Sequence, residues 1–452
     1  MTKKLIPLLA IIFGILQTNG QEIRVIDKDS KLPITSVKIS ANNSGLIVKT
    51  DEDGLVNLDL FSTYKPLKFS HPDYLVYEFT LRKIKKMNYE VLLTKRSEYL
   101  NEIVLSVSRK KENRNQVAEQ INVITSADIK KIAPQTSADL LASTAGVRVQ
   151  KSQFGGGSPV LRGMEANRVL LVIDGVRMNN AIYRKGHLQS AITVSPLSLE
   201  RTEVVFGPSS LMYGSDALGG VIHFYTQKPK PAKENAFNLS TYSRFSSANQ
   251  EITNQLSFEI IEDKWATYTS VSYSDFDDLR MGSNRSHGFE EWGLVPFYSE
   301  NTRTYFSEFP TANGEPELQK NTGYNQLDIL QKFVFDLEED RELTFNFQYS
   351  ESSDIPRFDR LTEYSGRELK FAEWSYGPQK RLLASAQLAS EINKSWMNSA
   401  NFVFAYQHLE EERLQRKFGS LARSYRNEFV DVFSLNADFT AELKETAFFN
   451  TV

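Results

Sequence analysis

From about residue 235 onward, the sequence alternates between apolar and polar residues in segments of about ten residues. In one such segment the apolar positions are Phe345, Phe347 and Tyr349, each separated by one residue. Successive side chains of a strand point to opposite faces, so the segment would have one apolar face and one polar face. This pattern is typical of a barrel whose strands cross a membrane. We expect strands over residues 236–247, 250–260, 265–275, 324–336, 342–350, 380–391, 396–408 and 427–440.

From the turn after Ile260 onward, the connections between these segments alternate in length. Short ones span residues 262–264, 337–341, 392–395 and 441–445, and long ones span residues 276–323, 351–379 and 409–426. Membrane barrels have short turns on the periplasmic side and long loops on the outer side, which produces this alternation. A soluble sandwich or β-helix gives no reason for it. We therefore expect the long connections to face outward.

Composition supports many half-polar strands. Aromatic residues make up 12% of the chain and the mean hydropathy is −0.38, which suits a strand-rich protein better than a helical membrane protein. A net charge of −3 gives no basic surface of the kind that nucleic-acid binding needs. The chain has no cysteine, which excludes disulfides, thiolate metal sites, a cysteine nucleophile and a lipoprotein anchor.

The first 20 residues have the features of an export signal. Lys3 and Lys4 give a positive start, residues 5–16 form a short apolar run, and Thr18 and Gly20 are small residues before a cleavage site. An apolar run of this length is too short to span a bilayer as a stable helix. We therefore expect a signal peptide over residues 1–20.

Between residues 154 and 226, three apolar runs are separated by glycine turns. The runs are residues 169–173, 203–206 and 221–225. Short apolar runs bounded by turn residues predict buried strands. Upstream, residues 121–124 and 147–149 predict further strands, and residues 126–131 and 137–141 predict short helices, the first with Ser126 as its N-cap. Together these features predict a compact α+β domain.

Several short stretches of this domain carry a more specific signal. In order, they are Leu161-Arg162-Gly163, Val172-Ile173-Asp174-Gly175-Val176, Glu203-Val204, Gly207-Pro208-Ser209-Ser210, Tyr213-Gly214 and Ala217-Leu218-Gly219-Gly220-Val221-Ile222. In order and spacing they resemble the plug domain of TonB-dependent outer-membrane receptors. We take Arg162, Gly163, Asp174, Gly175, Gly207, Pro208, Tyr213, Gly214, Gly219 and Gly220 as the plug signature.

The resemblance implies a fold and a location. A plug of this family sits inside a 22-stranded barrel in the outer membrane of a Gram-negative bacterium and blocks its lumen. The fold class is then mainly β: an N-terminal β-sandwich, an α+β plug, and the first part of a 22-stranded antiparallel transmembrane barrel. We expect a plug over residues 117–230 and a partial barrel over residues 235–452. An open sheet edge cannot lie in lipid, so we expect the chain to be a fragment of a longer one.

Residues 21–95 predict a small β-domain that resembles the carboxypeptidase-regulatory-like sandwich found before the plug in many such receptors. The resemblance rests on Pro33-Ile34, on Thr50-Asp51-Glu52-Asp53-Gly54 and on His71-Pro72-Asp73-Tyr74. Asp51 and Asp53 could suggest calcium, but the further ligands of an EF-hand loop are missing, so a turn is the better interpretation. The domain shows no zinc-ligand pattern.

Residues 96–116 form a polar linker that contains one apolar island. Glu102, Ile103, Val104, Leu105 and Ser106 in this island resemble the TonB box of the family. An extended segment of this kind can add a strand to the sheet edge of a partner, with backbone hydrogen bonds supplying affinity. The alternative is an ordinary last strand of the preceding sandwich.

The two most irregular stretches of the plug are residues 154–158 and 178–190, and the family's plug loops at the outer face touch the ligand. The ligand-facing candidates are therefore Phe154, Tyr183, Arg184 and His187. His187 could bind haem iron or an anionic chelate, and a solvated loop histidine is the alternative. No phosphate loop, serine-nucleophile elbow or histidine metal pair occurs in the sequence. We expect no catalytic residue, no resident metal and no cofactor.

The resemblance implies an energised importer that is not an enzyme. Its partners would be the TonB complex of the inner membrane, outer-membrane lipid and a small scarce ligand, with no nucleic acid. A ferric siderophore, haem or cobalamin is the expected cargo. Two alternatives stay open: an oligosaccharide importer of the same architecture, and a surface-binding β-protein that does not transport.

Overall fold

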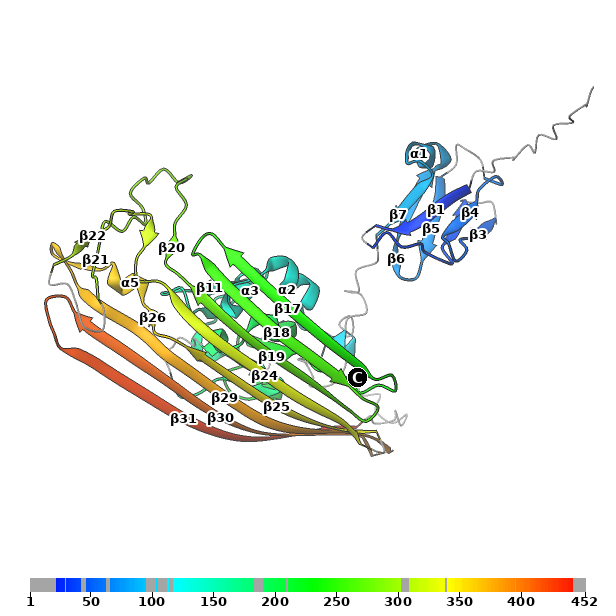
Figure 1. Ribbon diagram of the computed structural model, residues 1–452. Coiled ribbons are helices and arrows are strands. Elements are labelled where there is room, and N and C mark those ends of the chain that lie inside the picture. Colours follow the sequence, from blue (N-terminus) through cyan, green and yellow to red (C-terminus); the bar gives the residue numbers. More distant parts are fainter. Residues whose placement is uncertain are drawn as a thin grey trace, which may run out of the picture. The chain divides into compact units, whose positions relative to one another are not determined.

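The computed structural model describes residues 22–28, 30–41, 46–61, 66–94, 103–104, 112–113, 117–182, 190–208, 210–301, 309–337, 340–394 and 396–441. The chain divides into two units, Met1–Glu102 and Ile103–Val452. Strands dominate both units (Figure 1). No helix within the described residues is both long enough and apolar enough to cross a membrane.

The N-terminal unit consists of two small sheets around one core. The first sheet has the order β4-β1-β7, with β1 at Glu22–Asp27, β4 at Leu55–Asn57 and β7 at Glu90–Leu93. The second has the order β3-β2-β5-β6, with β2 at Lys38–Ala41, β3 at Ile47–Lys49, β5 at Pro66–His71 and β6 at Tyr74–Thr80. Helix α1 (Leu81–Lys86) follows β6. Val25, Ile39 and Phe69 are fully buried between these elements.

The turn at Asp51 in this unit is capped by its own side chain. One carboxylate oxygen of Asp51 accepts hydrogen bonds from the backbone N–H groups of Asp53 (3.0 Å) and Leu55 (2.7 Å). An aspartate that bonds to the backbone two residues ahead is a standard turn element. The turn interpretation of this acidic stretch therefore agrees with the structure.

The plug is built on a five-stranded sheet with the order β10-β15-β16-β13-β14. The strands are β10 (Gln120–Thr125), β13 (Val169–Ile173), β14 (Val176–Arg177), β15 (Leu199–Phe206) and β16 (Gly220–Thr226). Strands β13 and β16 run parallel and the other pairs run antiparallel. All five residues of β13 are buried, as its continuous apolar run predicts.

Short helices and a separate ladder complete the plug. They are α2 (Ser126–Ile132), α3 (Ser137–Ala142), α4 (Ser210–Tyr213), the 3-10 turns η3 (Ala166–Arg168), η4 (Ser190–Thr193) and η5 (Pro196–Ser198), and the paired strands β11 (Val147–Gln150) and β12 (Ser158–Leu161). The N-cap of α2 is Thr125 and not Ser126. Thr125 has an extended backbone, its hydroxyl accepts from the N–H of Asp128, and Asp128 accepts from the N–H of Thr125. This reciprocal capping box starts the helix after Thr125, so the Ser126 prediction was wrong by one residue.

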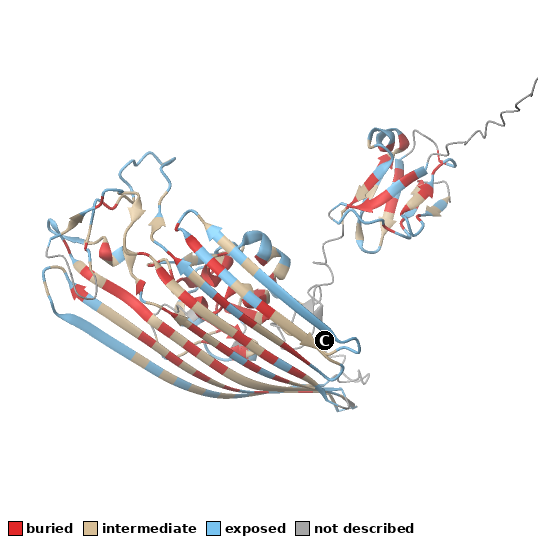
Figure 2. Ribbon diagram, in the orientation of Figure 1, coloured by how far each residue is buried: buried red, intermediate tan, exposed pale blue. Residues whose placement is uncertain are grey.

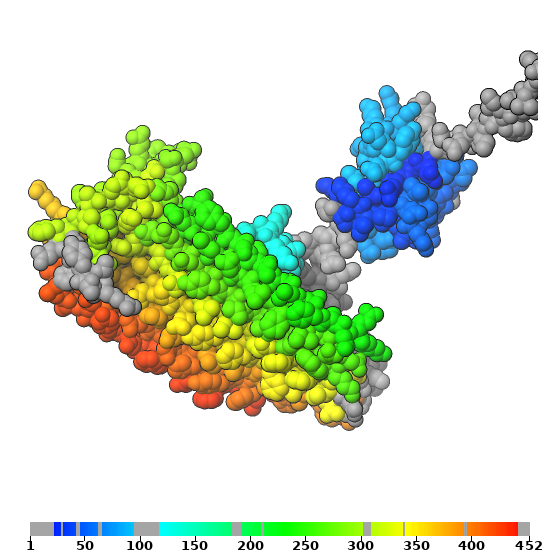
Figure 3. Space-filling view, viewed as in Figure 1, coloured from blue at the N-terminus to red at the C-terminus, as the bar shows by residue number. Residues whose placement is uncertain are grey.

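Eight long strands form the wall against which the plug packs. They are β17 (Ala236–Ser246), β18 (Glu251–Ile261), β19 (Trp265–Phe276), β24 (Tyr324–Leu337), β25 (Arg341–Ser352), β29 (Phe371–Lys394), β30 (Met397–Lys417) and β31 (Arg423–Thr440). Each is antiparallel to the next, from β17 to β31. Burial alternates along the strands (Figure 2), and the strands seen from outside cover most of the plug (Figure 3). The curved wall is open among the described strands, since β17 and β31 do not pair with each other.

Three wall strands are longer than the sequence predicts. The expected long connection over residues 409–426 is wrong, because β30 continues to Lys417 and β31 starts at Arg423. Pairing persists to Arg416 opposite Arg423. The added segments of β30 and β31 are rich in charged residues, which pair across strands, as in the ion pair between Arg413 and Glu428. An apolar alternation therefore could not reveal them.

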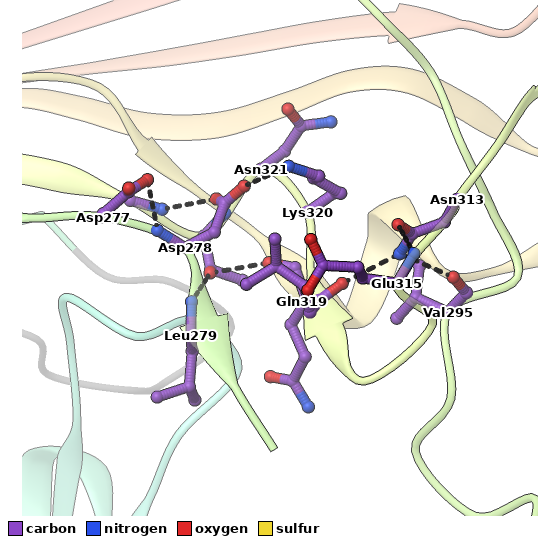
Figure 4. Close-up of polar contacts among 12 residues, drawn as sticks. Asp277, Asp278, Leu279, Val295, Asn313, Glu315, Gln319, Lys320 and Asn321 are labelled. Atoms are coloured by element: carbon purple, nitrogen blue, oxygen red, sulfur yellow. Dashed lines mark hydrogen bonds and ion pairs between the residues drawn. The ribbon is translucent and has the colours of Figure 1, made fainter. Parts of the chain in front are cut away.

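The long connection over residues 277–323 is held by polar contacts near its base (Figure 4). The Asp278 carboxylate accepts from the backbone N–H groups of Thr322 (2.8 Å) and Gly323 (3.3 Å) and lies 3.8 Å from the Lys320 ammonium. The Asn313 amide donates to the carbonyls of Val295 (2.9 Å) and Leu318 (3.0 Å). Two short ladders, β20 (Leu279–Arg280) with β23 (Leu318–Gln319) and β21 (Phe297–Tyr298) with β22 (Thr311–Ala312), brace the same connection.

A second connection carries β26 (Ile355–Pro356), α5 (Phe358–Leu361), β27 (Tyr364–Ser365) and β28 (Glu368–Leu369). Strand β26 pairs with the outer end of β29, and β27 pairs with β28. Trp374 and Tyr376 of β29 pack against Leu361 of α5. Both described long connections are thus folded structures rather than bare loops.

We expect Gly220→Ala to loosen the plug sheet. Gly220 has φ of +145°, and an added Cβ would lie 2.2 Å from the Val205 carbonyl oxygen. Overpacking of this kind typically costs about 1–3 kcal/mol. Trypsin digestion of the folded protein should cut the plug of Gly220→Ala faster than that of the unsubstituted protein. Gly282→Ala is the matched control, since nothing lies within 4 Å of its added Cβ, and an equal cleavage rate for both variants would contradict the packing argument.

Candidate functional site

The turn between β13 and β14 is where the plug is tied most densely to the wall. Asp174 occupies this turn with φ of +47°. Its carboxylate accepts from the N–H (2.9 Å) and hydroxyl (2.7 Å) of Thr226 in the plug, and from the amides of Asn346 (2.9 Å) and Gln348 (3.0 Å) on β25. Lys332 of β24 lies 3.2 Å away and is almost fully buried. We call these five residues the Asp174 latch.

The surroundings of the Asp174 carboxyl favour its ionised form. Burial of the Asp174 carboxyl opposes ionisation, but the Lys332 ammonium and the two hydrogen bonds from Thr226 outweigh it and hold the pKa of Asp174 below its usual value. Lys332 also donates to the Thr226 carbonyl at 3.1 Å. The ionised carboxylate therefore has a complete set of donors from both sides of the interface.

Further contacts extend this anchoring along the same hairpin. The Gln407 amide of β30 donates to the Arg177 carbonyl at 2.9 Å, and the Asn436 amide of β31 donates to the Gly175 carbonyl at 3.4 Å. In β14, Arg177 donates to the carbonyls of Tyr213 (3.1 Å) and Ser215 (3.0 Å) and pairs with Asp216 at 2.9 Å. The hairpin thus links the wall to the turn that contains Tyr213 and Gly214.

A second set of contacts holds the segment that carries η4 and η5. Buried Arg381 of β29 donates from Nε to the Thr193 hydroxyl (3.0 Å) and from Nη2 to the Thr193 carbonyl (3.1 Å). The Gln326 amide of β24 donates to the Ile192 carbonyl at 2.9 Å, and the Gln255 amide of β18 donates to the Leu197 carbonyl at 3.1 Å. Wall side chains therefore bind backbone carbonyls of the plug. These hydrogen bonds depend on the backbone conformation of the plug segment and not on its side chains.

A third set joins the start of the plug to the first wall strands. Arg244 of β17 donates to the carbonyls of Ala133 (3.2 Å) and Pro134 (2.9 Å) after α2, and it pairs with fully buried Glu251 of β18. Gln135 donates to Asn249 at 3.0 Å and to Glu251. The plug is thus bound to the wall by many hydrogen bonds and ion pairs in addition to apolar contacts, and water could replace each hydrogen bond if the plug moved.

The remaining signature residues shape the plug itself. The Arg162 guanidinium lies over the Phe206 ring at 5.1 Å and donates to Gln120, and Gly163 follows it with φ of +84°. Gly207, before exposed Pro208, has φ of +108° at the end of β15. Gly219 approaches Met164 and the Arg168 carbonyl so closely that a side chain there would clash. The signature thus marks turns and close backbone contacts.

Of the predicted ligand-facing residues, only Phe154 lies within the described part of the chain. Its half-buried ring packs edge-on against Phe276 (5.5 Å) and Tyr324 (5.9 Å) of the wall, beside Ile192 and Ile355. Tyr183, Arg184 and His187 lie outside the described residues. Ligand contact by any of the four stays a prediction.

The TonB-box candidate is described at two positions. Ile103 and Val104 form β8, which pairs antiparallel with Glu112 and Asn113 of β9 in a ladder of its own. Glu102, Leu105 and Ser106 lie outside the described residues. Neither sheet of the N-terminal unit includes β8, so the alternative of a last sandwich strand has no support in the described pairing.

Sequence reasoning missed the wall side of every one of these contacts. Gln326, Asp328 and Lys332 share the inward face of β24, and all look like ordinary lumen-facing polar residues of a barrel strand. Lys332 gave the one usable signal, since it is a lone cation in a run that is otherwise uncharged from residue 329 to 335. Identifying its partner required the register of the plug against the wall.

Comparisons with known proteins place these features in a family. Residues 113–221 match the family model of the TonB-dependent receptor plug domain. The vitamin B12 transporter BtuB of Vibrio vulnificus is 30% identical over 202 residues, which cover 42% of this chain and 31% of that protein. The chain thus spans about a third of the length of the curated relative that it matches.

Solved structures show the same fold. A crystal structure of the ferric enterobactin receptor of Pseudomonas aeruginosa aligns with a TM-score of 0.51 and 18% identity, over 72% of this chain and 47% of that one. The hemophore receptor HasR of Serratia marcescens aligns with a TM-score of 0.50 and 15% identity, over 72% of this chain and 46% of that one. The plug signature and the family match agree: the chain contains the plug domain of TonB-dependent receptors, within a fold that solved receptors of this kind share.

Proposed function

We propose that this receptor imports a scarce ligand across the outer membrane, with energy supplied through the TonB complex. The cargo would be of the kind named for its relatives, which include a vitamin B12 transporter, a ferric enterobactin receptor and a hemophore receptor. The observation that carries the proposal is the plug itself, held against the wall by polar contacts that can be exchanged.

In this proposal the plug closes the barrel, and the Asp174 latch is one of the contacts that hold it in the closed position. The plug segment 190–198 meets the wall through backbone carbonyls, so displacement of that segment breaks several hydrogen bonds at once. Water can replace each of them with little net change in free energy. The ion pair between Asp174 and Lys332 differs, because separating two buried charges is costly.

The Ile103–Val104 strand is the proposed binding segment through which a partner would pull on the plug. It already has an extended backbone and, within the described residues, pairs with Glu112 and Asn113. A partner with a free sheet edge could replace that short ladder with a longer one, and backbone hydrogen bonds would supply the affinity. The TonB protein of the inner membrane is the partner that the match to the plug domain suggests.

The first test separates binding from uptake. Val104→Pro removes a backbone N–H and fixes φ, so the segment loses a ladder hydrogen bond to its partner, which typically contributes about 1 kcal/mol. We expect normal surface levels and normal binding of the cognate ligand, found with a panel of cobalamin, ferric enterobactin and haem, but loss of its accumulation in cells. Val104→Thr keeps the N–H and should still accumulate ligand. Accumulation of ligand at the normal rate in cells making Val104→Pro would contradict the proposed role of the Ile103–Val104 strand.

The second test concerns the latch. Lys332→Met leaves the buried Asp174 carboxylate without its cation, which should destabilise plug docking by about 3 kcal/mol. Cells making this variant should admit a large antibiotic that the unsubstituted receptor excludes. Adding Asp174→Asn should restore exclusion in part, because the second change removes the uncompensated charge. Glu315→Gln breaks the exposed pair with Arg280 and serves as the control with no expected effect.

Acid should weaken the latch in a defined direction. The pKa of Asp174 is lowered by folding, so its stabilising contribution is complete above about pH 4, the ordinary value for aspartate, and is lost as pH falls through the lower folded value. The plug should therefore resist an acid-active protease at pH 5 and lose this resistance at lower pH. In Lys332→Met the resistance should be lost at a higher pH than in the unsubstituted receptor. An identical pH profile for the two proteins would show that the pair does not control docking.

A further inference from the structure

The outward face of the wall carries an uninterrupted uncharged band. On β30 the outward positions above Met397 are Asn398, Ala400, Phe402, Phe404 and Tyr406, none of which is charged. On β31, Phe433, Leu435 and Phe439 are each at least 60% exposed. The same rows continue through Phe345 and Phe347 of β25. An apolar belt of exposed aromatic residues on a barrel wall faces lipid.

One group of charged residues ends this band. Lys380 of β29 lies 3.4 Å from Glu351 of β25 and 3.8 Å from Glu410 of β30. His408 lies 3.0 Å from Glu410 through Nε2 and 2.8 Å from Asp431 of β31 through Nδ1. We call Glu351, Lys380, His408, Glu410 and Asp431 the boundary cluster.

The boundary cluster faces outward and not into the lumen. Its members pair directly across the strands, Glu351 with Lys380, Lys380 with Glu410, and His408 with Asp431. Their sequence neighbours Arg381 and Leu409 are buried on the opposite face. Each member keeps about a third or more of its side chain exposed although it is paired. Tyr349 and Tyr406 add hydroxyl donors to Glu351 (2.6 Å) and Asp431 (2.8 Å).

The height of the cluster matches the outer limit of the hydrocarbon. A strand rises about 3.3 Å per residue and barrel strands tilt by about 40°, so each residue adds about 2.5 Å along the membrane normal. From Met397 at the periplasmic end of β30, His408 is then about 28 Å higher, against an apolar band of about 25 Å in such barrels. Charges at this level can lie in the polar headgroup layer, whereas charges one or two pairs lower would lie in hydrocarbon.

We infer that the boundary cluster is a lipid-headgroup contact that sets the depth of the wall in the outer leaflet. The uncharged rows below it take the acyl chains, and the paired charges meet the polar headgroups. The strands continue beyond the cluster, with β29 starting at Phe371 and β30 ending at Lys417. These ends therefore project past the membrane and form part of the outer rim. The inference is independent of whether the receptor imports a ligand.

These 452 residues contain no cysteine, so a single introduced cysteine among them can report depth without background labelling from this part of the protein. Phe404→Cys places a label below the boundary cluster and Glu412→Cys places one above it, both on outward positions of β30. The receptor as produced by cells would be labelled with an environment-sensitive fluorophore and reconstituted. Lipids brominated in the acyl chain should quench the lower label and not the upper one, and aqueous iodide should do the reverse.

A second arm tests whether the charges set the depth. Combining Lys380→Leu, His408→Leu and Glu410→Leu should let the wall sink, so that the label at Glu412→Cys gains quenching by bromolipid and loses quenching by iodide. The matched variant with glutamine at the same three positions stays polar and should keep the original pattern. Bromolipid quenching at Glu412→Cys in the otherwise unchanged receptor would overturn the inference, as would an unmoved label in the leucine variant. If neither quencher reached the label at Phe404→Cys, a protein rather than lipid would cover this face.

Discussion

Lipid hydrocarbon offers no hydrogen-bond partner to a peptide group, and the architecture of the wall depends on this constraint. Every wall strand must give its N–H and C=O groups to its neighbours, which fixes the side chains in two alternating faces. One face then has to be apolar and the other is free to be polar. The plug uses that freedom: Lys332, Asn346, Gln348 and Arg381 are all inward residues of strands whose outward residues meet lipid.

The division between faces also explains how the plug can be both well bound and removable. Apolar contacts join the plug to the wall at Leu383, Val403 and Ala405 and where Phe154 meets Phe276 and Tyr324, and many polar contacts accompany them. Hydrogen bonds made across such a seam contribute little net free energy each, although together they specify one position. The buried ion pair of the Asp174 latch adds specificity in the same way. A seam of this composition favours a defined closed state without making it irreversible.

Much of this could be predicted from the sequence because the decisive patterns are local. The run at β13 is apolar throughout and bounded by a glycine turn, and it is a fully buried strand. The alternation from residue 235 onward predicted all eight wall strands. The outer ends of β30 and β31 escaped prediction because charged cross-strand pairs replace apolar alternation there, and that of β29 because Gly377-Pro378 interrupts the strand pattern. The Asp174 latch escaped for a different reason: its members are far apart in sequence, and only the docking register brings Asp174 to Lys332.

The outer rim is built in two different ways on its two sides, and this has a consequence for how the rim can vary. Beside β19 and β24 it consists of the connection over residues 277–323, whose described parts are held by contacts around Asp278 and Asn313 (Figure 4) and by hydrogen bonds from Asn301 to Ala372 and from Arg416 to Asn301. Beside β29 to β31 it consists of continuous ladder (Figure 1). An insertion of one residue into the ladder moves every following side chain to the opposite face, so length there changes only in pairs or through a bulge. The loop side can lengthen by any number of residues. Diversification of the receptor's mouth should therefore accumulate on the side of residues 277–323, while the ladder side keeps its shape.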